Sequence, residues 1–213
     1  MLGADKFGTL CVVYTIGMSK KDIINDVYSL IESRLSPKLT YHGIHHTKDV
    51  HDVCKFYIGH YKISDSEAEL LEIAAVAHDI GFIHTYRNHE AVGAEMIKEV
   101  MFDHNYSEDQ MDAVAEMILA TKVPQQPKNF LSEILCDADL DYSGRSDFDI
   151  IGRTLKNEWE LYGVFEDLDE NFDKLQISFL KNHSFHTDYA RKYRTPEKLK
   201  HLAALEARLG QEA

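Results

Sequence analysis

The first half of the chain carries apolar side chains at helical spacing, broken by proline and by short polar stretches. The pattern predicts a first helix that ends before Pro37 and a second helix after it. The apolar positions are Ile23, Ile24, Val27, Leu30 and Ile31 in the first helix, and Val50, Val53, Cys54, Tyr57 and Ile58 in the second. A third helix is expected from Ser64, which suits an N-cap, and its run from Leu70 to Ala77 is almost wholly apolar. That run predicts a helix buried on all sides.

Helical spacing continues to the end of the chain. Further helices are expected over 89–102, 107–119, 130–136, 147–162, 167–182 and 196–209. The one strand-like pattern is Leu10 to Ile16. The sequence therefore predicts an all-α fold with a single helical domain. Its parts are a poorly defined N-terminal segment (1–17), a helical core (18–145) and C-terminal helices packed on that core (146–213).

Composition narrows the class of protein. The chain has 213 residues, 44% of them hydrophobic, which suits one domain with a substantial core. A net charge of −13 argues against binding to a nucleic acid duplex, which requires a basic face. Three cysteines without a C-x-x-C motif favour a reducing, cytoplasmic compartment. No apolar run is long enough to span a bilayer, so no membrane association is expected, and the oligomeric state stays open.

Candidate chemistry begins at the end of the apolar third helix, where His78 and Asp79 follow Ala77. Both groups are costly to bury unless they are paired or bind a metal ion. His46 lies upstream and Asp139 downstream, each on or next to a predicted helix. The order His, His-Asp, Asp indicates a metal site of imidazole and carboxylate ligands.

Neighbouring residues compete for two of these positions. His42 and His45 lie close to His46, and adjacent helical residues point about 100° apart, so His45 and His46 cannot easily face one ion. His42 is expected to line the pocket or to cap the helix. Asp137 and Asp141 share a helical face that Asp139 does not, and Asp137 is a candidate for orienting a ligand histidine.

These residues together resemble the HD-domain superfamily of metal-dependent phosphohydrolases, over residues from Tyr41 to about Arg145. The resemblance lies in His46-Thr47 with Val50, in His78-Asp79-Ile80-Gly81, in the segment from His89 to Ala94, and in Asp139. It implies an HD-type helical core and selects His46, His78, Asp79 and Asp139 as the metal ligands. It also implies hydrolysis of a phosphate ester by a metal-activated water.

The expected cofactor is one divalent ion, namely Mn, Fe, Co, Ni, Mg or Zn. Four ligands leave open coordination positions, which indicates a catalytic rather than a structural ion. Two-metal relatives carry two further histidines. His89 is a possible first one, but Thr121 stands where the second is expected, which makes a second metal doubtful.

The catalytic candidates are Asp79, as a ligand that also holds the water, and His84 or His89 as the general acid. The expected substrate contacts are Arg145, Lys122 and Arg87, since arginine and lysine grip phosphate. Phe82 replaces a lysine that often follows the doublet in relatives. The predicted substrate is a nucleotide or another small phosphate ester. The alternatives are an iron-dependent oxygenase of the same fold and a non-catalytic metal-binding regulatory module.

Overall fold

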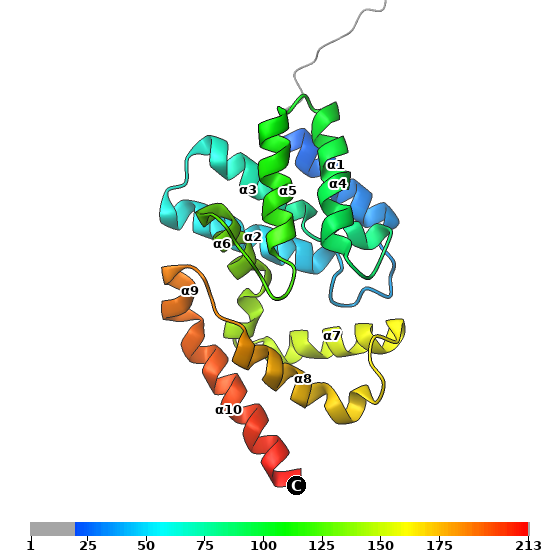
Figure 1. Cartoon of the computed structure of the whole chain (residues 1–213), viewed down its shortest axis with the longest axis vertical. Helices are drawn as coiled ribbons and strands as arrows, with labels where there is room; N and C mark the ends of the chain where they lie inside the picture. The colour runs from blue at the N-terminus through cyan, green and yellow to red at the C-terminus, as the bar shows by residue number, and fades with distance from the viewer. Residues whose placement is uncertain (1–19, 213) are drawn as a thin grey trace, which may run out of the picture.

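The computed structural model describes residues 20–212, and all regular structure in that range is helical (Figure 1). The all-α prediction is therefore confirmed for these residues. The predicted strand at 10–16 and the N-terminal segment 1–17 lie outside them. The α-helices are α1 (Lys20–Arg34), α2 (Ile44–Tyr61), α3 (Asp65–Ala77), α4 (His89–Asp103), α5 (Glu108–Ala120), α6 (Phe130–Asp139), α7 (Phe148–Tyr162), α8 (Leu168–Asn182), α9 (Asp188–Tyr193) and α10 (Thr195–Glu212). Two short 3-10 turns, η1 (Ile80–Ile83) and η2 (Asp141–Gly144), follow α3 and α6.

Side-chain caps account for several helix starts. The Ser64 hydroxyl accepts a hydrogen bond from the Glu67 amide at the start of α3, as its sequence predicts. The Asn129 side chain caps α6 in the same way. Some elements differ from the prediction, among them α10, which ends at Glu212 instead of residue 209. Helix α6 continues to Asp139 instead of ending at Cys136, and α9 was not predicted, although the Thr187 side chain caps it.

Helix α3 lies at the centre of the larger hydrophobic core, in contact with α1, α2, α5 and α6. Its last four residues, from Ala74 to Ala77, are each 0% exposed, so the C-terminal part of the helix is buried as predicted, whereas its first turn is exposed. The helix ends inside the protein. The residues that follow it, His78 and Asp79, are therefore delivered to the interior at 1% and 5% exposure.

A second hydrophobic core joins the C-terminal helices to the rest. Figure 1 shows α7 and α8 lying beneath α2 and α6, and α10, which follows α9, passes alongside α8. Three residues from the first part of the chain, Tyr41, Leu140 and Tyr142, pack there against Phe148, Leu180 and Leu205. The C-terminal helices are thus anchored on residues next to the predicted metal ligands. Among residues 20–212, every helix is too short or too polar to span a lipid bilayer.

Candidate metal centre

Three helices bring the predicted ligands together. His46 lies in the first turn of α2, His78 caps the end of α3, and Asp139 is the last residue of α6. The Nε2 atom of His46 lies 3.3 Å from Nε2 of His78 and 3.1 Å from Oδ1 of Asp139. The third side of this triangle, from His78 Nε2 to Asp139 Oδ1, measures 3.6 Å. Two imidazole nitrogens and a carboxylate oxygen therefore converge on one small volume, as a divalent ion requires.

Asp79 supplies a fourth oxygen at this point. Its Oδ2 atom lies 3.1 Å from His78 Nε2 and 3.6 Å from His46 Nε2. The same atom is buried and has no hydrogen-bond partner. A buried carboxylate oxygen without a donor is costly unless a cation balances it. This orphaned oxygen, together with the mixed donor set, fits a bound metal ion.

The surroundings fix the ligand atoms and favour positive charge. Nδ1 of His78 is 2.8 Å from the backbone oxygen of Ala75, so it carries the proton and leaves Nε2 free to bind a metal. Burial opposes a charge on His78, but Asp79 and Asp139 outweigh it and raise the pKa of His78 to about 9. Burial likewise opposes ionisation of Asp79, yet His78 holds the pKa of that carboxyl well below its usual range.

The competing residues face elsewhere. His45 is exposed, whereas His46 is buried. Asp137, fully buried, accepts hydrogen bonds from the backbone amides of His186 (2.8 Å) and Thr187 (2.7 Å), so it holds the chain before α9 instead of orienting a ligand histidine. Asp141 pairs with Arg194 at 2.6 Å.

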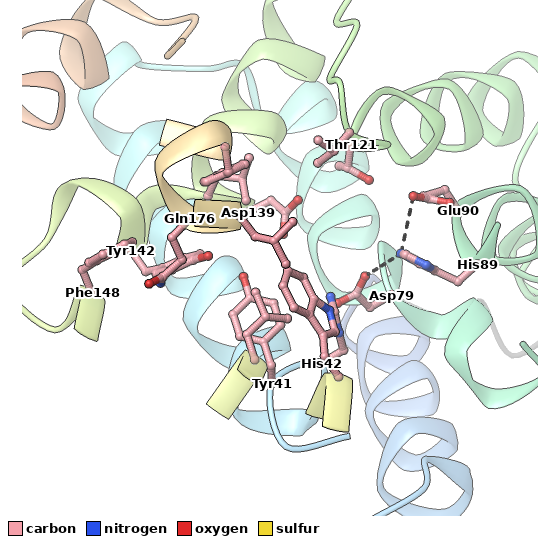
Figure 2. Close-up of a pocket in the computed structure, with 16 residues that line it drawn as sticks. Tyr41, His42, Asp79, His89, Glu90, Thr121, Asp139, Tyr142, Phe148 and Gln176 are labelled. Carbon is pink, nitrogen blue, oxygen red and sulfur yellow. Dashed lines mark ion pairs between the residues drawn. The ribbon is translucent and has the colours of Figure 1, made fainter. Parts of the chain in front are cut away.

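A second group of side chains adjoins Asp79. His89, the first residue of α4, places Nε2 3.3 Å from Asp79 Oδ1 and 3.8 Å from Glu90 Oε1, as the dashed lines in Figure 2 show. Thr121 faces the same pocket, but its hydroxyl donates to the Ile118 carbonyl oxygen. The residue at that position therefore offers no imidazole.

His42 is held by a carboxylate that the sequence did not single out. Its Nδ1 atom lies 2.5 Å from Oε1 of Glu158 on α7. Glu158 is 0% exposed, and its Oε2 accepts from the backbone amides of Tyr41 (2.8 Å) and His42 (2.9 Å). The Tyr86 hydroxyl donates to the same carboxylate at 2.8 Å. Burial opposes protonation of His42, but the hydrogen bond with Glu158 outweighs it and raises the pKa of the imidazole.

Phe82 sits between two pocket histidines. Its ring stacks on His42 at 4.3 Å and on His89 at 3.8 Å between centroids. The residue that replaces the lysine of many relatives therefore packs both imidazoles in place. From the sequence, Phe82 indicated only the loss of a lysine charge. Its contacts with the two imidazoles give it an orienting role.

His42, Asp79, His89, Thr121 and Asp139 line one pocket of about 290 Å³. Its polar side chains include His42, Asp79, His89, Glu90 and Asp139, and aromatic and aliphatic side chains of α7 and α8 form much of the rest. Figure 2 places His42, Asp79, His89 and Glu90 on one side of the pocket and Tyr142 and Phe148 on the other. The pocket thus combines the candidate metal centre with an apolar chamber built by helices far away in the sequence.

Six predicted site residues lie outside this lining: His46 and His78, which adjoin the lining residues Asp79 and Asp139, and four others. His84 and Arg87 are exposed, and Lys122, also exposed, donates to Asn88 Oδ1 at 2.8 Å. Arg145 is gripped by the carboxylates of Asp49 and Asp147, each at 2.9 Å. The structure therefore brings Asp79, His89 and the metal ligands together, and it does not bring the three predicted phosphate contacts to them.

Comparison with known proteins agrees with this geometry. Residues 43–141 match the HD domain family, so this part of the chain is an HD domain, and its limits enclose His46, His78, Asp79 and Asp139. Helices α7 to α10 lie beyond the matched segment. No curated protein and no solved structure matches the chain.

Proposed function

We propose that this HD-domain protein is a metal-dependent phosphohydrolase that cleaves a nucleotide or another small phosphate ester. HD domains generally have this activity. The observation that carries the proposal is the convergence of His46, His78 and Asp139 beside the orphaned Oδ2 atom of Asp79. Asp79 and Asp139 line a pocket that is large enough for a small ligand, and both adjoin His46 and His78.

His46, His78, Asp79 and Asp139 would hold one divalent ion. Mn²⁺, Fe²⁺, Co²⁺, Ni²⁺, Mg²⁺ and Zn²⁺ all accept this donor set. When bound, such an ion lowers the pKa of a water molecule and neutralises charge on phosphoryl oxygens. Asp79 is held at its other oxygen, Oδ1, by His89, which fixes the carboxylate between two histidines.

His42 is the proton donor that we favour for the leaving oxygen. Its Nδ1 atom is bonded to Glu158, so the second ring nitrogen, Nε2, remains for the pocket that the residue lines. His89 has its Nε2 at Asp79, and His84 is exposed and outside the pocket lining. Imidazole suits proton transfer near neutral pH, and a positioned general acid contributes about 10²- to 10⁴-fold to a rate.

The direct test measures phosphate release from nucleotides and simple phosphate esters with each of the six ions. We expect turnover that depends on the metal and falls by at least about 100-fold in His46→Ala and Asp139→Ala. The matched control is His45→Ala, which removes the exposed neighbouring histidine and leaves turnover unchanged.

Metal content is measured on the same samples by mass spectrometry. The wild type and His45→Ala are expected to bind one ion, and His46→Ala to bind less. A protein that holds its ion but releases no phosphate from any compound would contradict the proposed function.

A further inference from the structure

The apolar end of the pocket points to a class of substrate. Its wall comes from α7 and α8, which contribute Leu155, Trp159, Leu175 and Phe179, and from Phe148 at the start of α7. All five lie outside the HD domain. Tyr41, which also lines this region, packs edge-on against Tyr142 with 5.6 Å between the ring centroids.

No lysine or arginine is found among the described residues that line the pocket. Cations that lie close to lining residues in the sequence are engaged elsewhere: Arg145 by Asp49 and Asp147, and Lys122 by Asn88. Lys156, on α7, is paired with Asp169. Negative charge on a ligand can therefore be balanced at the metal centre and at His42, and nowhere along the apolar wall.

The carboxylates at the polar end of the pocket also limit the number of phosphate groups that a substrate can carry. Asp79, Glu90 and Asp139 already bring carboxylates to that end. A second or third phosphate would lie against these carboxylates or against the apolar wall, and burying an unpaired charge there is costly. One phosphate group at the metal centre is what the pocket can neutralise.

The volume of the pocket and its few polar side chains restrict the organic group of the substrate. About 290 Å³ is at the lower end of the range for ligand pockets, so the occupant is compact. Gln176 on α8 is the single amide side chain of the described lining. A polyol would leave most of its hydroxyls without partners, whereas an aromatic or aliphatic group would replace water along the wall.

We propose that the substrate is a phosphate monoester of a compact, uncharged aromatic or aliphatic alcohol, and that α7 and α8 select it. The phosphate lies at the HD-domain ligands and the organic group lies between Trp159, Leu155 and Leu175. The placement of the phosphate rests on the proposed function. Recognition of the organic group does not, because it can be measured without metal and without turnover.

The kinetic arm compares 1-naphthyl phosphate with glycerol phosphate, which share one phosphate and differ in polarity. We expect kcat/KM to favour the naphthyl ester by at least about 30-fold. Adenosine triphosphate is expected to be a poorer substrate than adenosine monophosphate. Equal rates for the naphthyl and glycerol esters, or preference for the triphosphate, overturn the inference and leave the proposed function standing.

The binding arm uses Trp159, which is the one tryptophan of the sequence and lines the wall. In chelator, 4-nitrobenzyl alcohol is expected to quench its fluorescence saturably, while glycerol does not. If no ester is hydrolysed, saturable quenching still supports the apolar wall, and the proposed function alone fails. Absence of saturable quenching overturns the inference.

Substitutions in the apolar wall test where the alcohol binds. Leu155→Asn on α7 and Leu175→Asn on α8 place an amide in the wall from two different helices, so that misfolding of one variant leaves the other to decide. Both are expected to weaken binding of the alcohol by about tenfold or more. Leu161→Asn, on the exposed side of α7 and outside the lining, is the matched control and keeps wild-type binding. Equal affinity in all three variants overturns the assignment of the wall.

Discussion

Glu158 shows how much a single buried carboxylate can organise. It accepts hydrogen bonds from the His42 ring, from two backbone amides and from the Tyr86 hydroxyl. Every one of its partners lies before or at the start of α2, or just after η1. Glu158 is therefore a positioning residue, which acts on the pocket through His42.

Replacement of Glu158 by glutamine tests this role. The amide keeps the shape but loses the charge that raises the pKa of His42, so the alkaline limb of the kcat profile moves to lower pH. We expect kcat to fall by about 10- to 100-fold with a smaller change in KM.

The control for this change is Glu160→Gln, two residues further along α7. Glu160 is exposed, and its ion pair with Lys156 is long at 3.8 Å. A rate loss in Glu158→Gln without a shift of the pH profile would indicate a purely structural role for the carboxylate.

At this scale the sequence predicted the side chains that the structure brings together as a candidate metal centre, whereas the three predicted phosphate contacts lie outside the pocket lining. His46, His78 and Asp139 follow an order along the chain that can be recognised without coordinates. Arg145 was expected to grip phosphate because it follows Asp139 closely, yet its guanidinium is taken by Asp49, nearly a hundred residues earlier in the chain. Glu158 was missed for the same reason: its partner His42 is 116 residues away.

At the scale of elements, the turn after α3 approaches α4 closely. A Cβ atom at Gly81 would lie 2.0 Å from the backbone oxygen of His89 and 2.8 Å from the amide nitrogen of Gly93. No flexible side chain can yield there, because both contacts are backbone. The absence of a side chain at Gly81 therefore fixes where α4 begins and where His89 meets Asp79.

Gly81→Ala is accordingly expected to lower the free energy of unfolding by about 1–3 kcal/mol, the usual cost of overpacking. It is also expected to reduce turnover, because α4 must shift. Urea denaturation measures the first effect. Gly59→Ala, in an exposed position of α2 with open space around it, should instead raise stability slightly. Equal stability of the two variants would show that the turn tolerates a side chain.

The elements themselves were largely predictable, because periodicity and caps are local. Helices α3, α7 and α8 appear within a residue or two of the predicted limits. Helix α9 was missed because it spans only six residues and is stabilised by contacts with distant parts of the chain. One such contact is the hydrogen bond of 3.1 Å from the Tyr189 amide to the Tyr61 hydroxyl.

At the scale of the whole molecule, the C-terminal helices meet at a buried junction between His183 and Lys198. The Lys198 ammonium, 5% exposed, donates to the backbone oxygen of His183. The His183 ring stacks on Phe179, and both ring nitrogens are buried without partners. Burial, with the nearby Lys198 charge, lowers the pKa of His183 to about 3.

This junction predicts acid sensitivity. Below about pH 6.5 the unfolded chain protonates His183 while the folded protein does not, so stability falls from there towards pH 3. His183→Phe should flatten this loss. The measurement is urea unfolding between pH 7 and pH 4 in chelator, so that metal release does not contribute. His84→Phe, an exposed histidine, is the control. An unchanged pH slope in His183→Phe would contradict the prediction.

The second hydrophobic core has a consequence for modularity. Tyr41, Leu140 and Tyr142 flank the metal ligands along the chain, and they also anchor α7, α8 and α10. A transplant of residues 43–141 into another scaffold would carry all four predicted ligands. It would leave behind His42, Glu158 and the apolar wall that α7 and α8 give to the pocket. Under the proposed function, the matched HD domain would therefore be an incomplete unit. Under the proposed function, exchange of the C-terminal helices would change the apolar wall of the pocket and the support of His42 in one step.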